Sequence, residues 1–236
     1  MARIVIVATI SLVSFFIAGF AYFGVERVML RMESHSLQGG KAAGLSAELF
    51  YQSLDGRLIT KLKTPVNQVM ITNRLGELTI YDPEKNTVYR TQSLEYSSEN
   101  NLIYYFLNGK TQDMGLAEMG FTRQKAEFDG ALMITQWMPP SQLNHLFSYI
   151  ELVHEDYMPI YAGYYDAGGK LVKKVYYSEY EIFADIILPM RLTEFNYLPT
   201  GDSIINRVIL SDVRINRRAI SSWYDFEIPE DASIID

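Results

Sequence analysis

The sequence contains no cysteine, and this absence excludes several classes of protein. A disulfide scaffold, a thiolate zinc site, a thiol nucleophile and a lipid-modified amino-terminal cysteine all require that side chain. Histidine is almost as scarce, because His35, His145 and His154 are the only three in 236 residues. We therefore expect neither a metal site nor a bound cofactor.

A surplus of positive charge is also missing. Lys and Arg number 21 against 28 Asp and Glu, for a net charge of −7, whereas a nucleic-acid-binding surface needs a basic excess. Nucleic acid is therefore not expected as a partner. Intrinsic disorder is excluded by an apolar content of 48%. What remains is a folded domain that is unusually rich in tyrosine, with 17 of them.

Signatures of enzymes are absent or weak. The sequence has no Gly-x-Ser-x-Gly elbow, phosphate loop or dinucleotide fingerprint. Gly201-Asp202-Ser203 resembles the nucleophile block of one esterase class, but all three histidines precede it, which favours a loop turn before a strand. His154-Glu155-Asp156 lacks the second histidine that a metal site would want and is better interpreted as a strand-end turn. We predict that the protein is not an enzyme.

The first 24 residues form a membrane signal. An uncharged apolar run extends from Ile4 to Phe23, directly after Arg3. Small residues at Gly19 and Ala21 suit a signal peptidase, whereas the length meets the roughly 20 residues that a spanning helix needs. Residues 1–24 are therefore predicted to be either a signal peptide or an uncleaved anchor, and residues 25–236 a single exported domain.

Helical periodicity appears in four stretches. Apolar residues in Val25–Ser36 recur at helical spacing, and Ser98–Leu107 begins with a serine suited to cap a helix. Gln112–Met119 and the short Ser141–Phe147 are the other two. We predict helices in all four.

The rest of the domain is predicted to be β. The turn-forming pairs Asp55-Gly56, Leu75-Gly76 and Asp129-Gly130 separate short apolar segments. The expected strands are Ala47–Ser53, Arg57–Thr64, Gln68–Asn73, Glu77–Tyr81, Thr87–Thr91, Phe121–Phe128, Ala131–Met138, Ser148–His154, Met158–Tyr165, Leu171–Tyr180, Met190–Tyr197, Ser203–Ile215 and Tyr224–Ile228.

Strands at this spacing, without long helices between them, favour a mainly β protein with some α structure. We predict a half-open antiparallel β-barrel or strongly curved sheet covered by short helices. Alternation along the strands is imperfect, since Ile204, Ile205, Val208 and Ile209 fall on both faces. Either a helix or loop covers the outer face, or the sheet encloses an apolar concavity that holds a lipid.

Particular segments resemble a known family. They are Phe50-Tyr51-Gln52, Lys63-Thr64-Pro65, the stretch from Leu75-Gly76 to Asp82-Pro83, two lid-like helices, and the closing segment from Tyr224 to Ala232. From Val25 onward the chain is similar to the LolA-like periplasmic lipoprotein carriers. The resemblance implies a half-open barrel, covered by helices, whose cavity binds the acyl chains of lipoproteins.

The resemblance directs attention to apolar side chains on the strands and the lid. The residues expected to line the cavity or its lid are Leu58, Leu62, Val69, Ile71, Leu78, Ile80, Leu102, Tyr105, Phe106, Met114 and Met133. A parity error of one residue would invert the strand assignments. The sequence departs from the family in three places. Its apolar first segment is long for a soluble carrier, which must shed its signal. The other two departures lie in the domain itself. Thr64 stands where many carriers have the arginine that tethers the lid, and Ser141–Tyr165 looks like added sequence.

Two functions follow as hypotheses. The favoured one is a carrier of lipoprotein acyl chains, or of a related lipid, in the periplasm of a Gram-negative-type envelope. Residues 4–23 would tether it to the inner membrane if they are retained, and its partners would be an inner-membrane release complex and an outer-membrane acceptor. The alternative is a membrane-anchored envelope interaction domain with a filled, ligand-free core. An apolar void beneath the helices around Leu102 and Met114 distinguishes them.

Overall fold

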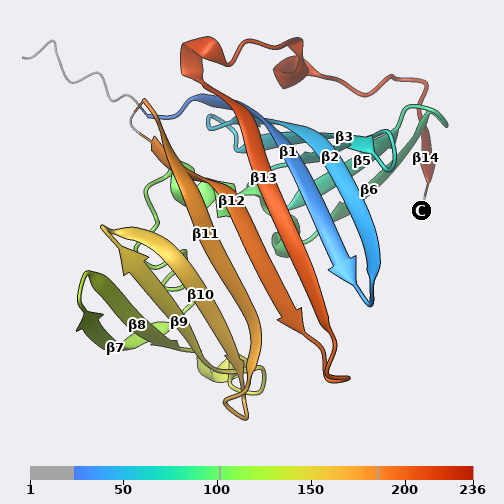
Figure 1. The fold of residues 1–236 in the computed structure, drawn as a ribbon. Helices are drawn as coiled ribbons and strands as arrows, with labels where there is room; N and C mark the ends of the chain where they lie inside the picture. Colours follow the sequence, from blue (N-terminus) through green and yellow to red (C-terminus); the bar gives the residue numbers. More distant parts are fainter. Residues whose placement is uncertain (1–23, 101, 185, 236) are drawn as a thin grey trace, which may run out of the picture.

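A computed structural model describes residues 24–100, 102–184 and 186–235. One curved sheet dominates the described chain (Figure 1). Its strands are β1 (Arg27–Gln38), β2 (Lys41–Gln52), β3 (Arg57–Thr64), β4 (Gln68–Thr72), β5 (Glu77–Asp82), β6 (Thr87–Gln92), β7 (Thr122–Asp129), β8 (Leu132–Met138), β9 (Phe147–Glu155), β10 (Met158–Asp166), β11 (Leu171–Phe183), β12 (Ile186–Tyr197), β13 (Ser203–Ile215) and β14 (Ser233–Ile235).

The sheet is open, with its strands in the order β14-β6-β5-β4-β3-β2-β1-β13-β12-β11-β10-β9-β8-β7. Neighbours pair antiparallel, except that β14 runs parallel to β6. Strand β1 lies in the middle and joins the two halves, because it pairs with both β2 and β13. The strands bend round the short helices near the centre of Figure 1. The predicted fold class, a strongly curved sheet with short helices, is confirmed.

Helical structure in the described residues is brief. A single α-helix, α2 (Leu102–Leu107), packs against β12, and 3-10 turns form at η1 (Leu94–Tyr96), η2 (Ser98–Asn100), η3 (Ser141–Leu143), η4 (Asn216–Arg218) and η5 (Ser222–Asp225). Helix α2 and the turns before it correspond to the predicted helix Ser98–Leu107. In Ser141–Phe147 only η3 is helical, so the predicted helix there is a single turn.

Apolar side chains are buried on both faces of the sheet. The inner face, which carries α2, holds a core that includes Leu30, Leu49 and Phe106. The outer face of β2–β6 holds a second core built around Phe50, covered by the segment that follows β13. Trp223 and Tyr224 of that segment place their rings 6.0 and 5.8 Å from the ring of Phe50. Two-sided burial explains why apolar residues occur on both faces of β1 to β3.

The prediction of a helix over Val25–Ser36 is wrong, because this stretch forms strand β1. Val28 and Leu30 are buried in the inner core, whereas Met29 packs into the outer core. Since both faces of β1 are covered, apolar residues of both parities occur, and their spacing imitates that of a helix.

Two further predictions are also wrong. Gln112–Met119 forms consecutive turns instead of a helix, because Met114 and Gly115 have φ angles of 51° and 78°, outside the right-handed helical region. Tyr224–Ile228 is not a strand but the end of η5 and an extended stretch that packs its aromatic rings on the outer core. The other predicted strands are present, with ends that shift by a few residues.

Within residues 24–100, 102–184 and 186–235, no helix has the length and apolarity needed to cross a membrane. The predicted signal peptide or anchor lies outside the described residues, apart from Gly24. The division into residues 1–24 and 25–236 therefore stays a prediction.

Candidate functional site: an apolar cavity beneath helix α2

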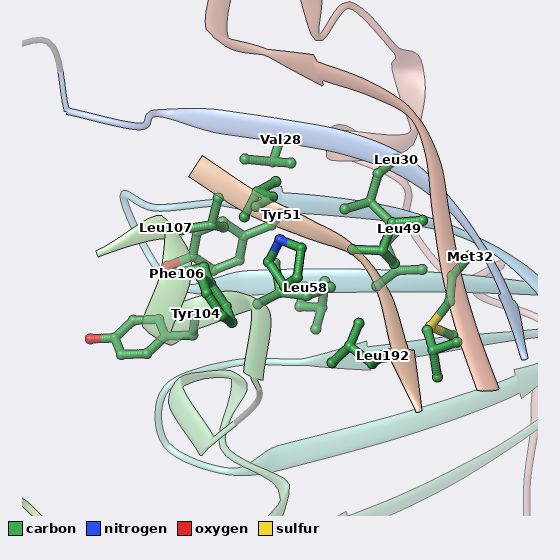
Figure 2. A pocket seen from close by; sticks show the side chains of 15 residues that line it. Val28, Leu30, Met32, Leu49, Tyr51, Leu58, Tyr104, Phe106, Leu107 and Leu192 are labelled. Atoms are coloured by element: carbon green, nitrogen blue, oxygen red, sulfur yellow. The ribbon is translucent and has the colours of Figure 1, made fainter. Parts of the chain in front are cut away.

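An apolar cavity of about 270 Å³ lies between the inner face of the sheet and α2. Figure 2 shows side chains of β1, β2 and α2 that point into one space. The lining is aliphatic or aromatic throughout, and Tyr51 and Tyr104 carry its only hydroxyl groups. The lining residues are Val28, Leu30, Met32, Leu49, Tyr51, Leu58, Ile103, Tyr104, Phe106, Leu107, Leu188, Pro189, Leu192, Val208 and Leu210. Such a space suits a hydrocarbon chain better than a polar metabolite.

Helix α2 is too short to be stable alone, so its contacts with the sheet must hold it in place. Phe106 is 3% exposed, and its ring lies 6.1 and 6.2 Å from the rings of Tyr177 and Tyr180 on β11. The ammonium of Lys110 lies 5.1 Å from the ring centre of Tyr104, which is half-buried and also lines the cavity. The helix therefore presents its apolar side chains to the cavity, as expected of a lid.

Polar contacts fix the segment that leads into α2. The buried Ser98 hydroxyl donates to the backbone carbonyl of Gly56, and the Ser98 backbone N–H donates to Asn73 at 3.0 Å. Arg74 forms an ion pair of 2.9 Å with Glu99. Family resemblance places the lid-tethering arginine at the position of Thr64. Here the arginine that contacts the start of the lid is Arg74, in the turn between β4 and β5.

A second cavity, of about 960 Å³, continues along the inner face on the other side of α2. Leu192 and Val208 line both cavities, so the two spaces adjoin. The second is covered by Tyr105 and by the turns over residues 108–121, including Met114 and Leu116. Burial raises the pKa of Tyr164, which also lines it, to about 12, so this hydroxyl keeps its proton at neutral pH.

His154 ties these turns to the sheet. Its ring is 1% exposed, and its Nε2–H donates to the Thr111 carbonyl at 2.9 Å. Burial lowers the pKa of His154, and the bond to Thr111 opposes that shift only in part. The imidazole is therefore neutral at neutral pH and serves as a structural donor, which agrees with the strand-end interpretation of His154-Glu155-Asp156.

Replacing this histidine should remove a pH dependence of stability. The pKa of His154 in the folded chain lies below the reference value of 6.5, so its contribution is complete above 6.5 and is lost as the pH falls from 6.5 through the folded pKa. We expect His154→Gln, which keeps a donor for Thr111, to flatten this loss, at most about 1.4 kcal/mol per pH unit. Urea unfolding at pH values on either side of 6.5 measures it.

The exposed His35→Gln is the matched control for replacing an imidazole with an amide. If the free energy of unfolding of His154→Gln depends on pH as steeply as that of the wild type, the pH dependence comes from other groups.

The sequence-predicted site residues are distributed over several places. Leu58 and Phe106 line the apolar cavity, Tyr105 and Met114 line the second cavity, and Leu62 packs against the inner core. Leu78 is buried and Ile80 half-buried, in register with β4 residues and away from both cavities. Met133 is half-buried opposite His154. Leu102 belongs to α2, but its side chain lies outside the described part of the structure.

The face assigned to Val69 and Ile71 is wrong. Ile71 pairs with Ile59, and both Val69 and Ile71 pack into the outer core. The turn over residues 65–67 lies between β3 and β4, so the face of a β4 residue does not follow from counting along β3. Alternation within β4 shows which residues share a face, but not which face points to the cavity.

Sequence reasoning also missed part of the cavity. Val28, Leu30 and Met32 were assigned to a helix, and Leu192 and Val208 lie in strands that are apolar on both faces. The signal that would have identified them is that Val28, Leu30 and Met32 occupy every second position. Residues at this spacing lie on one face of a strand.

Comparison with solved structures identifies the fold. An outer membrane lipoprotein-sorting protein domain from Vibrio parahaemolyticus is 15% identical, with a TM-score of 0.57 over 83% of this chain and 87% of that chain. A LolA superfamily protein from Nitrosomonas europaea is 11% identical, with a TM-score of 0.55 over 87% and 92%. A DUF1329 family protein from Desulfovibrio piger is 17% identical, with a TM-score of 0.58 over 85% and 89%.

At these identities the likeness concerns the fold, and the chain has a LolA-like fold. No family model matches the sequence, and no curated protein matches it.

Proposed function

We propose that this protein binds acyl chains in the cavity beneath α2 and carries lipoproteins, or a related lipid, across a bacterial envelope. The apolar lining of that cavity is the observation that supports the proposal most directly. The fold supports it as well, because two structures with this fold are described as a lipoprotein-sorting domain and a LolA superfamily protein.

The energetics suit a carrier. Each methylene group that leaves water contributes about 0.8 kcal/mol, so even part of an acyl chain is held firmly. Release requires that the cavity open, and the short α2 is the element that covers it. In the proposed release step α2 moves away from the cavity, which is a smaller rearrangement than opening the hydrogen-bonded sheet.

The alternative is an anchored envelope interaction domain with a filled core. A cavity of about 270 Å³ beneath α2 favours the carrier over this alternative. We place the carrier in the periplasm, non-catalytic and without a cofactor, tethered if residues 4–23 are retained. An inner-membrane release complex and an outer-membrane acceptor would be its partners.

The full chain should be expressed in a bacterial host that processes envelope proteins, and the lipids that co-purify with it identified by mass spectrometry. We expect acylated material in an amount comparable to the protein. A folded, lipid-free protein that also fails to bind an added palmitoylated peptide would contradict the proposal and favour the filled-core alternative.

A further inference from the structure

A row of polar side chains crosses the inner face beside the apolar cavity. Lys173 on β11, Glu194 on β12 and Asn206 on β13 all line the second cavity, and Asn206 pairs with Glu194 in the strand register. Asn196 follows Glu194 on the same face and pairs with Lys173. These four residues, which we call the polar row, stand out on a face that is otherwise mostly apolar.

Hydrogen bonds hold the polar row in one arrangement. The Glu194 carboxylate accepts from Lys173 Nζ at 2.6 Å, from Asn196 Nδ2 at 2.6 Å and from Asn206 Nδ2 at 3.3 Å. Burial alone would raise the pKa of Glu194, but these donors outweigh it and hold the pKa below its usual value. Lys173 also lies 5.5 Å from the ring centre of Tyr164. The Glu194 carboxyl is therefore ionised at neutral pH.

The polar row adjoins the apolar cavity directly. Leu192 and Val208 line both cavities. Leu192 lies two residues before Glu194 on β12, and Val208 lies two residues after Asn206 on β13. Two residues along a strand span about 7 Å. Hydrocarbon-binding and polar surfaces therefore meet within the length of a small amphiphile, which would place its chain beneath α2 and its head on the polar row.

The charge balance indicates the chemistry of that head. Glu194 neutralises Lys173, so an anionic head would gain little from the ammonium and would lie beside a carboxylate. The Lys173 ammonium has further N–H donors, and the asparagine amides supply carbonyl oxygens that accept. Together they can donate to and accept from a neutral group. Hydroxyl and amide groups fit this arrangement better than a phosphate.

We propose that the polar row selects an uncharged, hydroxyl- or amide-bearing head on the amphiphile whose acyl chain occupies the apolar cavity, an inference that rests on the proposed function. Two sources supply this chemistry: the glycerol of a neutral lipid, and the peptide amides that follow an acylated residue.

Four probes with the same palmitoyl chain test the proposal on the delipidated full chain. They are a monoacylglycerol, a palmitoylated dipeptide amide, palmitate and a palmitoyl lysophosphatidic acid. We expect the first two to bind at least about tenfold more tightly than the two anions. The tighter of the neutral pair identifies the source.

Substitutions in the ion pair should change this selectivity in opposite directions. Glu194→Gln leaves Lys173 uncompensated and should raise the affinity for the phosphate probe about tenfold. Lys173→Gln leaves the Glu194 carboxylate uncompensated and should lower the affinity for the phosphate probe below that of the wild type. Glu179→Gln is the matched control, because its ion pair with Arg191 lies on the same two strands but lines neither cavity.

Equal affinity for all four probes in the wild type, or unchanged selectivity in both variants, would overturn the inference while leaving acyl binding intact. Failure of all four probes to bind would instead contradict the proposed function. Thermal unfolding of each variant verifies that a change in selectivity comes from a folded protein.

Discussion

Replacing Leu58 with tryptophan is expected to weaken the binding of a palmitoyl chain about a hundredfold. Leu58 lines the apolar cavity from β3, and an indole there would occupy space that methylene groups otherwise fill. Exclusion of three or four methylenes removes ~3 kcal/mol of binding free energy, which is about two powers of ten in affinity. Displacement of a fluorescent fatty acid from the delipidated full chain measures the change.

Leu54→Trp is the control for this prediction. Leu54 is 84% exposed in the turn between β2 and β3, so the same substitution adds an indole without reaching the cavity. Its affinity should equal that of the wild type. If Leu58→Trp binds the palmitoyl chain normally while remaining folded, the acyl chain does not occupy the cavity beneath α2.

Replacing Phe50 with alanine is expected to lower the free energy of unfolding by about 3–5 kcal/mol. Phe50 is 2% exposed and lies at the centre of the outer core, where Trp223 and Tyr224 of the carboxy-terminal segment cover it. Deleting the ring leaves a cavity and removes the ring contacts of Phe50 with Trp223 and Tyr224. Urea unfolding gives the free energy, and the melting temperature should fall by roughly 2–4 °C per kcal/mol.

Phe128→Ala provides the comparison, because Phe128 is 77% exposed on β7 and its loss should change stability by no more than about 0.5 kcal/mol. Fluorescence of Trp223 supplies a second readout, since its ring leaves an apolar environment when the segment detaches. Equal stability of Phe50→Ala and the wild type would mean that the outer core contributes little to folding.

Much of the fold was predictable from local signals in the sequence. Asp129-Gly130 specified the hairpin of β7 and β8, and Leu75-Gly76 the turn between β4 and β5. Gly76 has a φ of 71°, and a Cβ there would lie 2.0 Å from the Ser93 carbonyl oxygen, so the turn requires glycine. The signals that succeeded were those in which a few neighbouring residues determine the backbone.

The predictions that failed depended on distant parts of the chain. β1 looked helical because α2 and the carboxy-terminal segment bury opposite faces of it, and neither contact is visible from residues 25–36. Val69 and Ile71 were assigned to the cavity for the same reason. Phe106, predicted on the lid helix, and Leu58, predicted on the concave wall, both line the apolar cavity, whereas the polar row combines residues from three strands and has no local pattern.

The open sheet has two edges, and each is protected against pairing with another chain. At one edge, β14 covers β6 with a strand of only 3 residues, too short to serve as a template for further strands. At the other, β7 carries the charged side chains Arg123, Lys125, Glu127 and Asp129, and its register shifts between Arg123 and Lys125. Growth of the sheet by aggregation is therefore opposed at both ends. The carrier that we propose could thus expose apolar surface to its lipid without polymerising with its own copies.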